Sequence, residues 1–116
     1  MSNIKRIDPN HRRSRAVVHG NTIYFCGQVA DDYDADIVEQ VNQALTKLDK
    51  LLEELGSHKS KVLSATLWLK TMGDYSKMNE VWDAWIDPAN PPARSCGVVE
   101  MADPKLLFEI TATAAI

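Results

Sequence analysis

The chain has 116 residues, of which 45% are hydrophobic and 25% charged, a composition typical of a single globular domain. Its net charge of −3 argues against a nucleic-acid-binding protein, which usually carries a basic surface. The longest uncharged apolar run, residues 62–69, is far too short to span a membrane. The first residues also lack the apolar core of a signal peptide. We therefore expect one domain over residues 1–116 in the cytoplasm, with no membrane segment and no nucleic-acid partner.

The two cysteines, Cys26 and Cys96, are typical of reduced thiols rather than of a disulfide framework. The sequence contains no Cys-x-x-Cys motif and no cluster of cysteines and histidines. Structural zinc sites in small domains are built from such clusters, so we expect no metal site.

The first part of the chain predicts a β-hairpin. Residues 15–19 are the first strand candidate, Gly20-Asn21 is a turn signal, and residues 22–26 are rich in strand-forming side chains. Gly27 ends the second strand. A polar, acidic loop over residues 31–34 follows.

The most regular pattern in the chain predicts a long helix that ends at Gly56. Asp36 has the residue type of an N-cap, and Glu39 stands three residues later, in capping-box spacing. Apolar residues then recur at helical spacing, namely Ile37, Val41, Ala44, Leu45, Leu48, Leu51, Leu52 and Leu55. Gly56 is a typical helix stop.

The second half of the chain alternates strands with a shorter helix. Residues 62–69 predict a third strand, whose apolar face consists of Leu63, Ala65, Leu67 and Leu69. Residues 74–85 predict a second helix, which Asp74 caps. Residues 94–99 and 107–114 predict the fourth and fifth strands.

The predicted order ββαβαββ indicates an α+β sandwich in which two helices cover one face of a mixed sheet. The even-numbered residues of the last strand, from Phe108 to Ala114, are apolar and suit the covered face. The other face mixes polar, aromatic and aliphatic side chains, namely Tyr24, Cys26, Ser64, Thr66, Trp68, Leu107, Thr111 and Thr113. Because this face is too apolar for water and too polar for a core, we expect other copies of the chain to cover it.

Two charged residues lie within segments that otherwise predict strands. Arg94 follows Pro91-Pro92, which disfavours helix, and Glu109 lies between Phe108 and Ile110. A charge in such a segment is costly unless a polar or oppositely charged group meets it. The pattern therefore indicates a small anion-binding pocket. The alternatives are that Arg94 is a plain surface residue or the ion-pair partner of Glu109.

Two segments together resemble the C-terminal signature of the RidA (YjgF-type) family, namely Pro92-Ala93-Arg94-Ser95-Cys96 and Phe108-Glu109-Ile110-Thr111-Ala112-Thr113-Ala114. Supporting positions along the chain are Gly20-Asn21, Cys26-Gly27-Gln28, Gly56 and Asn79. The similarity covers about residues 15–116. The Trp82-Asp83-Ala84-Trp85 run most resembles a YoaB-like branch of the family.

This resemblance implies a chorismate-mutase-like fold and a homotrimer whose sheets form a central barrel, with a cleft between neighbouring subunits. RidA proteins hydrolyse reactive 2-imino acids and their enamine tautomers to 2-oxo acids and ammonia, without a cofactor. We therefore expect a deaminase of the 2-iminobutanoate or 2-iminopropanoate type, acting in metabolite damage control. The alternative is a non-catalytic protein that binds or senses 2-oxo acids in the same cleft.

The resemblance also implies roles for individual residues. Arg94 and Glu109 are the expected catalytic pair, in which Arg94 binds the substrate carboxylate and Glu109 orients or activates the hydrolytic water. The other expected substrate-binding residues are Cys96, Gly27, Cys26 and Asn79. Cys96 is expected to contribute mainly backbone groups, because no histidine has a spacing that marks it as the base of a nucleophilic thiol. Gly27 as a plain strand end and Asn79 as a helix-surface residue remain alternatives.

The N-terminal stretch departs from the family pattern. RidA proteins often carry a tyrosine there that lines the pocket, whereas this chain has Arg12-Arg13-Ser14-Arg15. A solvated basic stretch is the simpler interpretation. Alternatively, Arg13 or Arg15 reaches the cleft and favours a more anionic substrate. An RNA-acting role, sometimes assigned to this family, is disfavoured by the net charge of −3.

Overall fold

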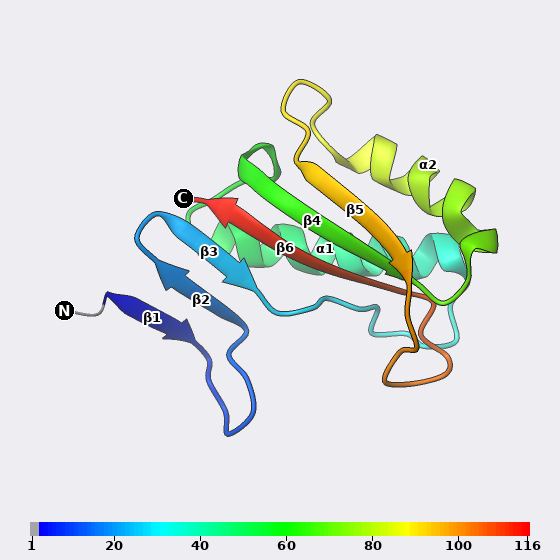
Figure 1. Cartoon of the computed structure of the whole chain (residues 1–116), viewed down its shortest axis with the longest axis horizontal. Coiled ribbons are helices and arrows are strands. Elements are labelled where there is room, and N and C mark those ends of the chain that lie inside the picture. The colour runs from blue at the N-terminus through cyan, green and yellow to red at the C-terminus, as the bar shows by residue number, and fades with distance from the viewer. Residues whose placement is uncertain (1–2) are drawn as a thin grey trace.

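The computed structural model describes residues 3–116 and places six strands in one sheet (Figure 1). The strands are β1 (Ile4–Ile7), β2 (Ala16–His19), β3 (Thr22–Phe25), β4 (Val62–Leu69), β5 (Ala93–Val98) and β6 (Phe108–Ala115). The helices are α1 (Ile37–Glu54) and α2 (Tyr75–Trp85), with 3-10 turns η1 (Lys59–Lys61) and η2 (Met72–Asp74). The strand order across the sheet is β1-β2-β3-β6-β4-β5, and β4 and β5 are the parallel pair. These findings confirm the α+β class and the mixed sheet.

Strand β1 adds an element that the predicted order ββαβαββ lacks. It pairs antiparallel with β2 at one edge of the sheet, and Ile4, Lys5 and Arg6 are exposed. An edge strand with charged side chains shows no alternation of buried and exposed residues, so its sequence carries no strand pattern.

The ends of α1 follow from local backbone chemistry. Asp36 Oδ1 accepts the backbone N–H of Glu39 at 2.9 Å, which confirms the predicted N-cap. Gly56 has a φ of +78°, a conformation that favours glycine. The N–H groups of Gly56 and Ser57 donate back to carbonyls in the last turn, which forms a Schellman motif. The predicted stop at Gly56 is thus confirmed.

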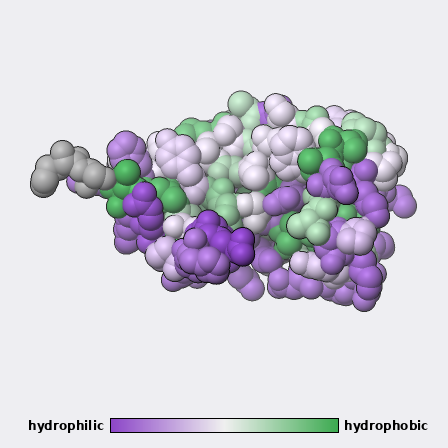
Figure 2. Space-filling view, turned by 60° about the horizontal axis from the view of Figure 1, so that its bottom comes forward, coloured by the Kyte–Doolittle hydropathy of each residue, from purple (hydrophilic) through white to green (hydrophobic). Residues whose placement is uncertain are grey.

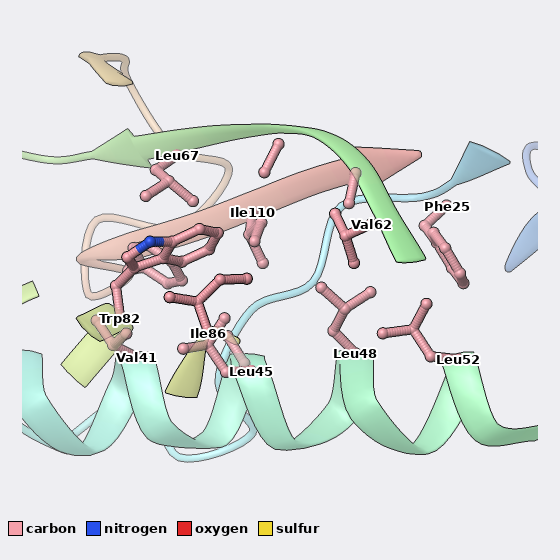
Figure 3. Packing of buried hydrophobic residues seen from close by; sticks show 14 of the residues in the cluster. Phe25, Val41, Leu45, Leu48, Leu52, Val62, Leu67, Trp82, Ile86 and Ile110 are labelled. Carbon is pink, nitrogen blue, oxygen red and sulfur yellow. The ribbon is translucent and has the colours of Figure 1, made fainter. Parts of the chain in front are cut away.

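The core lies between α1 and the face of the sheet that the helices cover. Phe108, Ile110, Ala112 and Ala114 of β6 are all buried, as the alternation predicts. Figure 3 shows residues from α1 pointing toward residues from the strands and from the region of α2, including Val41, Leu45, Leu48, Leu52, Val62, Leu67, Trp82 and Ile110. Burial of these side chains is the main stabilising contribution to the fold.

The predicted apolar face of β4 is wrong at its first position. Leu63 is 50% exposed, whereas Val62 is buried with the core. The pairing of β4 with β6 shifts register between Val62 and Ser64, so one extra residue is inserted there. This irregularity reverses the side of the sheet to which the preceding residues point.

The predicted side-chain cap of α2 is also wrong. Asp74 occupies the N-cap position, but its side chain makes no capping hydrogen bond. The chain instead enters α2 through the turn η2, where Thr71 Oγ1 accepts the backbone N–H of Gly73 at 3.2 Å. The cap therefore acts three residues earlier than the sequence pattern indicates.

Gln40 of α1 is a buried polar residue that joins two loops. Its amide nitrogen donates to the carbonyls of Tyr33, Ala35 and Lys105 at 3.3, 3.1 and 3.1 Å. Its Oε1 accepts the backbone N–H of Leu107 at 2.9 Å. Gln40 thereby connects the loop before α1 to the segment that leads into β6.

We expect Gln40→Leu to lower the free energy of unfolding by on the order of 2–4 kcal/mol, because the four part-buried backbone groups that Gln40 contacts would lose their partner. Urea unfolding at a fixed protein concentration measures the change. Gln43→Leu is the matched control on the same helix, because Gln43 bonds to exposed partners. Equal losses in the two variants would contradict this role for Gln40.

The face of the sheet opposite the helices stays half-exposed in the single chain. Tyr24 is 48% exposed, and Thr66, Trp68, Thr111 and Thr113 are of intermediate burial. The space-filling view shows hydrophobic patches set among hydrophilic side chains on the side that it displays (Figure 2).

Candidate functional site

Arg94 lies in the edge strand β5 and points to the helix-covered face. It pairs with the buried Ala65 in parallel register, and paired residues share a face of the sheet. Its Nη1 donates to Asn79 Oδ1 at 2.8 Å, and its Nη2 donates to Tyr75 Oη at 3.3 Å. The guanidinium carbon lies 5.4 Å from the ring centroid of Trp82. Three residues of α2 therefore fix the position of this cation.

The partners of Arg94 are all neutral. None of the ion pairs within residues 3–116 includes Arg94, so the alternative of an ion pair with Glu109 is wrong. A shallow hollow of about 370 Å³ lies beside the guanidinium, lined by Asn79, Trp82, Asp83, Pro91, Pro92 and Arg94. A half-buried cation that forms no ion pair and lies next to an open hollow is suited to binding an external anion.

Glu109 lies in β6 on the opposite face of the sheet. It pairs with Trp68 of β4, whose neighbours Leu67 and Leu69 point into the core. The Glu109 carboxylate lies directly over Gly27, where a Cβ would come 1.9 Å from Oε2. The absence of a side chain at Gly27 therefore makes this position of the carboxylate possible.

The two faces separate the expected catalytic pair within one chain. Arg94 lies on the helix side of β5, whereas Glu109 lies on the open side of β6, and β4 runs between these two strands. The structure thus places the expected site residues in two separate groups, called half-sites below. Arg94 and Asn79 form the first, and Glu109 and Gly27 form the second. Cys26 directly precedes Gly27 and is of intermediate burial.

Cys96 presents its backbone rather than an activated thiol. Burial raises the pKa of the thiol, and the nearby Arg94 opposes this shift only in part. The backbone N–H of Val99 donates to the carbonyl of Leu69 at 3.1 Å. Because backbone direction alternates along a strand, Arg94 and Cys96 turn their N–H and C=O groups to the open edge.

We expect slow alkylation of Cys96 by iodoacetamide at pH 7, measured in a Cys26→Ser variant where Cys96 is the only thiol. The raised pKa means that less thiolate is present than in the urea-unfolded chain at the same pH. The labelling rate should rise as the pH approaches the raised pKa. Faster labelling of the folded than of the unfolded protein at pH 7 would be the opposite result.

The sequence analysis did not single out Tyr75, and it used Trp82 only for the resemblance to a YoaB-like branch. In the structure Trp82 is buried, and it also contacts the Arg94 guanidinium. Tyr75, Asn79 and Trp82 follow one another at helical spacing, so they form one face of α2. That spacing, next to a cationic strand residue, is the signal that could have identified the group.

In the basic N-terminal stretch, Arg15 forms ion pairs with two carboxylates. Arg15 Nη1 lies 2.7 Å from Asp8 Oδ2 and 3.6 Å from Glu54 Oε2, and the hydrogen bond with Asp8 raises the pKa of Arg15. Arg12 and Arg13 are exposed. The interpretation of a solvated stretch fits these residues, and a contact of Arg13 with a ligand stays a prediction.

Three further findings concern other parts of residues 3–116. A larger hollow of about 590 Å³ lies between the end of β5 and residues 99–106, and it contains none of the predicted site residues. Within residues 3–116, no group of three or more His, Cys, Asp or Glu side chains is placed to hold a metal ion. Neither α1 nor any other helix of this part of the chain is long and apolar enough to cross a membrane.

Comparisons with known proteins place this fold and these residues in one family. A family model described as endoribonuclease L-PSP matches residues 3–116. The RutC family protein YoaB of Escherichia coli is 40% identical over 113 residues, covering 97% of this chain and 98% of that protein. A RutC family protein of Haemophilus ducreyi is also 40% identical, covering 97% of each chain.

Solved structures agree with this assignment. An uncharacterized protein from Pseudomonas aeruginosa superposes with a TM-score of 0.94 at 40% identity, covering 97% of this chain and 98% of that chain. A YjgF-family protein from Neisseria meningitidis has a TM-score of 0.93 at 37% identity, covering 98% and 95%. The chain therefore belongs to the YjgF/RidA family and has its chorismate-mutase-like fold. The match begins at residue 3, so the resemblance extends further toward the N-terminus than residue 15.

Proposed function

We propose that this protein hydrolyses reactive 2-imino acids and their enamine tautomers to 2-oxo acids and ammonia. The observation that carries the proposal is the Arg94 guanidinium, which is half-buried, held by neutral groups and in no ion pair within residues 3–116. Membership of the YjgF/RidA family supports the same conclusion.

Arg94 is proposed to bind the carboxylate of the substrate. A guanidinium presents N–H groups in a planar fork that matches a carboxylate, and the resulting hydrogen bonds are charge-assisted. Asn79, Tyr75 and Trp82 hold the fork in place before the ligand arrives, which reduces the entropy lost on binding. The substrate class is therefore a small acid with one negative end.

Glu109 is proposed to act on water. Imine hydrolysis adds water to the carbon of the C=N bond and then breaks the carbon–nitrogen bond, so both protons of the water must move from oxygen to nitrogen. A carboxylate beside the reacting atoms accepts each proton from oxygen in turn and passes it to nitrogen, which leaves as ammonia. An enamine first gains a proton at carbon and loses one from nitrogen to become the imine. The position of the Glu109 carboxylate over Gly27 supports this role, because Gly27 has no side chain that would displace the carboxylate.

The two half-sites are proposed to meet between neighbouring copies in a homotrimer. Arg94 and Glu109 point to opposite faces of the sheet, so one chain alone does not bring them together. The half-exposed face of the sheet, with Tyr24 and Trp68, supports burial against another copy. The cleft between the copies would then combine Arg94 and Cys96 of one chain with Glu109, Gly27 and Cys26 of the next.

An assay of imines generated in situ tests the activity. An amino-acid oxidase produces the imines from alanine, 2-aminobutanoate, leucine and glutamate, and semicarbazide traps the imine that remains. Addition of the protein should lower semicarbazone formation and speed the release of 2-oxo acid. An unchanged yield with every amino acid, from protein whose fold is verified, would reject the proposed reaction for these substrates.

The second candidate is a non-catalytic protein that binds 2-oxo acids in the same cleft. The exposed basic residues Arg12 and Arg13 support this candidate, because the family often carries an aromatic residue in this stretch. Calorimetric binding of 2-oxobutanoate without any imine hydrolysis would support this candidate over the deaminase.

A further inference from the structure

Tyr75 places a phenolic hydroxyl against the cation of the candidate site. It lies at the start of α2, and its Oη accepts a hydrogen bond from Arg94 Nη2 at 3.3 Å. A guanidinium only donates hydrogen bonds, so the phenolic oxygen must be the acceptor in this contact. The hydroxyl proton of Tyr75 is therefore not used by Arg94 and points elsewhere.

That proton has no acceptor of its own in the described part of the chain. Among the hydrogen bonds of residues 3–116, Tyr75 Oη takes part only in the contact with Arg94. The side chain is of intermediate burial and packs against the hydrophobic core, which restricts where the hydroxyl can turn. The Tyr75 O–H and the Arg94 N–H groups are therefore neighbouring donors, and neither has an anionic acceptor in the described part of the chain.

We propose that the Tyr75 hydroxyl is a second donor to the carboxylate that Arg94 binds. This inference rests on the proposed function, and it adds to it a residue and a reason for selecting a carboxylate. Each carboxylate oxygen accepts two hydrogen bonds, so one oxygen receives both an Arg94 N–H and the Tyr75 O–H, or the two oxygens share them. The contact is charge-assisted and therefore stronger than an ordinary hydroxyl bond.

Titration calorimetry with 2-oxobutanoate tests the contact without relying on catalysis. The full chain is compared with Tyr75→Phe, which removes one hydroxyl and keeps the ring that packs against the core. We expect the dissociation constant to rise about tenfold or more, as for loss of a hydrogen bond to a charged group. Tyr33→Phe, in an exposed loop, is the matched control and should leave binding unchanged. A change of less than twofold in Tyr75→Phe would overturn the inference.

A second measurement separates direct contact from mere alignment of Arg94. With tyrosine labelled by ¹³C at Cζ, the Tyr75 resonance, assigned by its loss in Tyr75→Phe, should shift when 2-oxobutanoate saturates the protein. The Tyr33 resonance should not shift. Weaker binding of the variant with an unmoved Tyr75 resonance would show that the hydroxyl only supports Arg94, and this would also overturn the inference.

The variant Arg94→Ala distinguishes failure of this inference from failure of the proposed function. If Arg94→Ala abolishes binding while Tyr75→Phe does not weaken it, the site stands and Tyr75 is not a ligand donor. If Arg94→Ala binds 2-oxobutanoate as tightly as the parent protein, the carboxylate site itself is wrong, and the inference falls with it.

Discussion

Arg94→Ala is expected to lower kcat/KM for imine hydrolysis by at least about 100-fold. Two charge-assisted hydrogen bonds to the substrate carboxylate would be lost, and each contributes about 1.5–3 kcal/mol. The initial rate of 2-oxo acid formation, measured over a range of imine concentrations, gives the value. Because no carboxylate pairs with Arg94 within residues 3–116, its removal leaves no buried anion behind.

Two further variants sharpen this test. Arg94→Lys keeps the charge but loses the planar fork, so its activity should lie between those of Arg94→Ala and the parent protein. Lys77→Ala removes an exposed cation from the same helix α2 and should leave activity unchanged. Full activity in Arg94→Ala, at unchanged thermal stability, would show that Arg94 is not part of the active site.

Gly27→Ala is expected to reduce activity about as strongly as loss of Glu109 itself. The added Cβ would meet Glu109 Oε2 at 1.9 Å, and the Glu109 carboxyl carbon at 2.8 Å, so the carboxylate must move. Gly27 does not have a positive φ, and so its backbone suits alanine and the clash alone should cause the loss. The kinetic comparison is with Glu109→Gln, for which general base catalysis suggests a fall of about 100- to 10,000-fold in kcat.

A double-mutant cycle isolates the proposed coupling between these two residues. If Gly27→Ala acts by displacing Glu109, then adding it to Glu109→Gln should cost little more, because the carboxylate is already absent. Gly73→Ala is the control, since its Cβ would meet only Thr71 Oγ1, at an ordinary 3.6 Å. Fully additive losses from Gly27→Ala and Glu109→Gln would show that Gly27 acts independently of Glu109.

The elements with strong periodicity could be predicted from the sequence. Helix α1 follows from the apolar spacing between Asp36 and Gly56, and β6 follows from the alternation that begins at Phe108. Strand β1 could not be predicted in this way, because its residues are mostly exposed and it is defined by pairing with β2. The exposed position of Leu63 depends on a register shift against β6, which is a tertiary feature that local alternation does not contain.

The sequence predicted that Arg94 and Glu109 lie in strands, but it did not predict how the two residues are placed relative to each other. Arg94 and Glu109 stood out as charges in strand-like segments, and both lie on strands of the central sheet. Their placement on opposite faces depends on how β5 and β6 pair with β4, which a single strand pattern does not reveal. Tyr75 was not predicted as a site residue, because a tyrosine at helical spacing is ordinarily a packing residue. Only its contact with Arg94 in the structure indicates a role in the candidate site.

Mixing two inactive variants tests the central claim most directly. Arg94→Ala and Glu109→Gln chains are unfolded together in equal amounts and refolded, and mass spectrometry verifies that the oligomers contain both. If each site takes Arg94 from one copy and Glu109 from its neighbour, random assembly leaves about one site in four intact, and about a quarter of the parent activity should return. Mixed oligomers that remain as inactive as the two variants alone would contradict a site shared between copies.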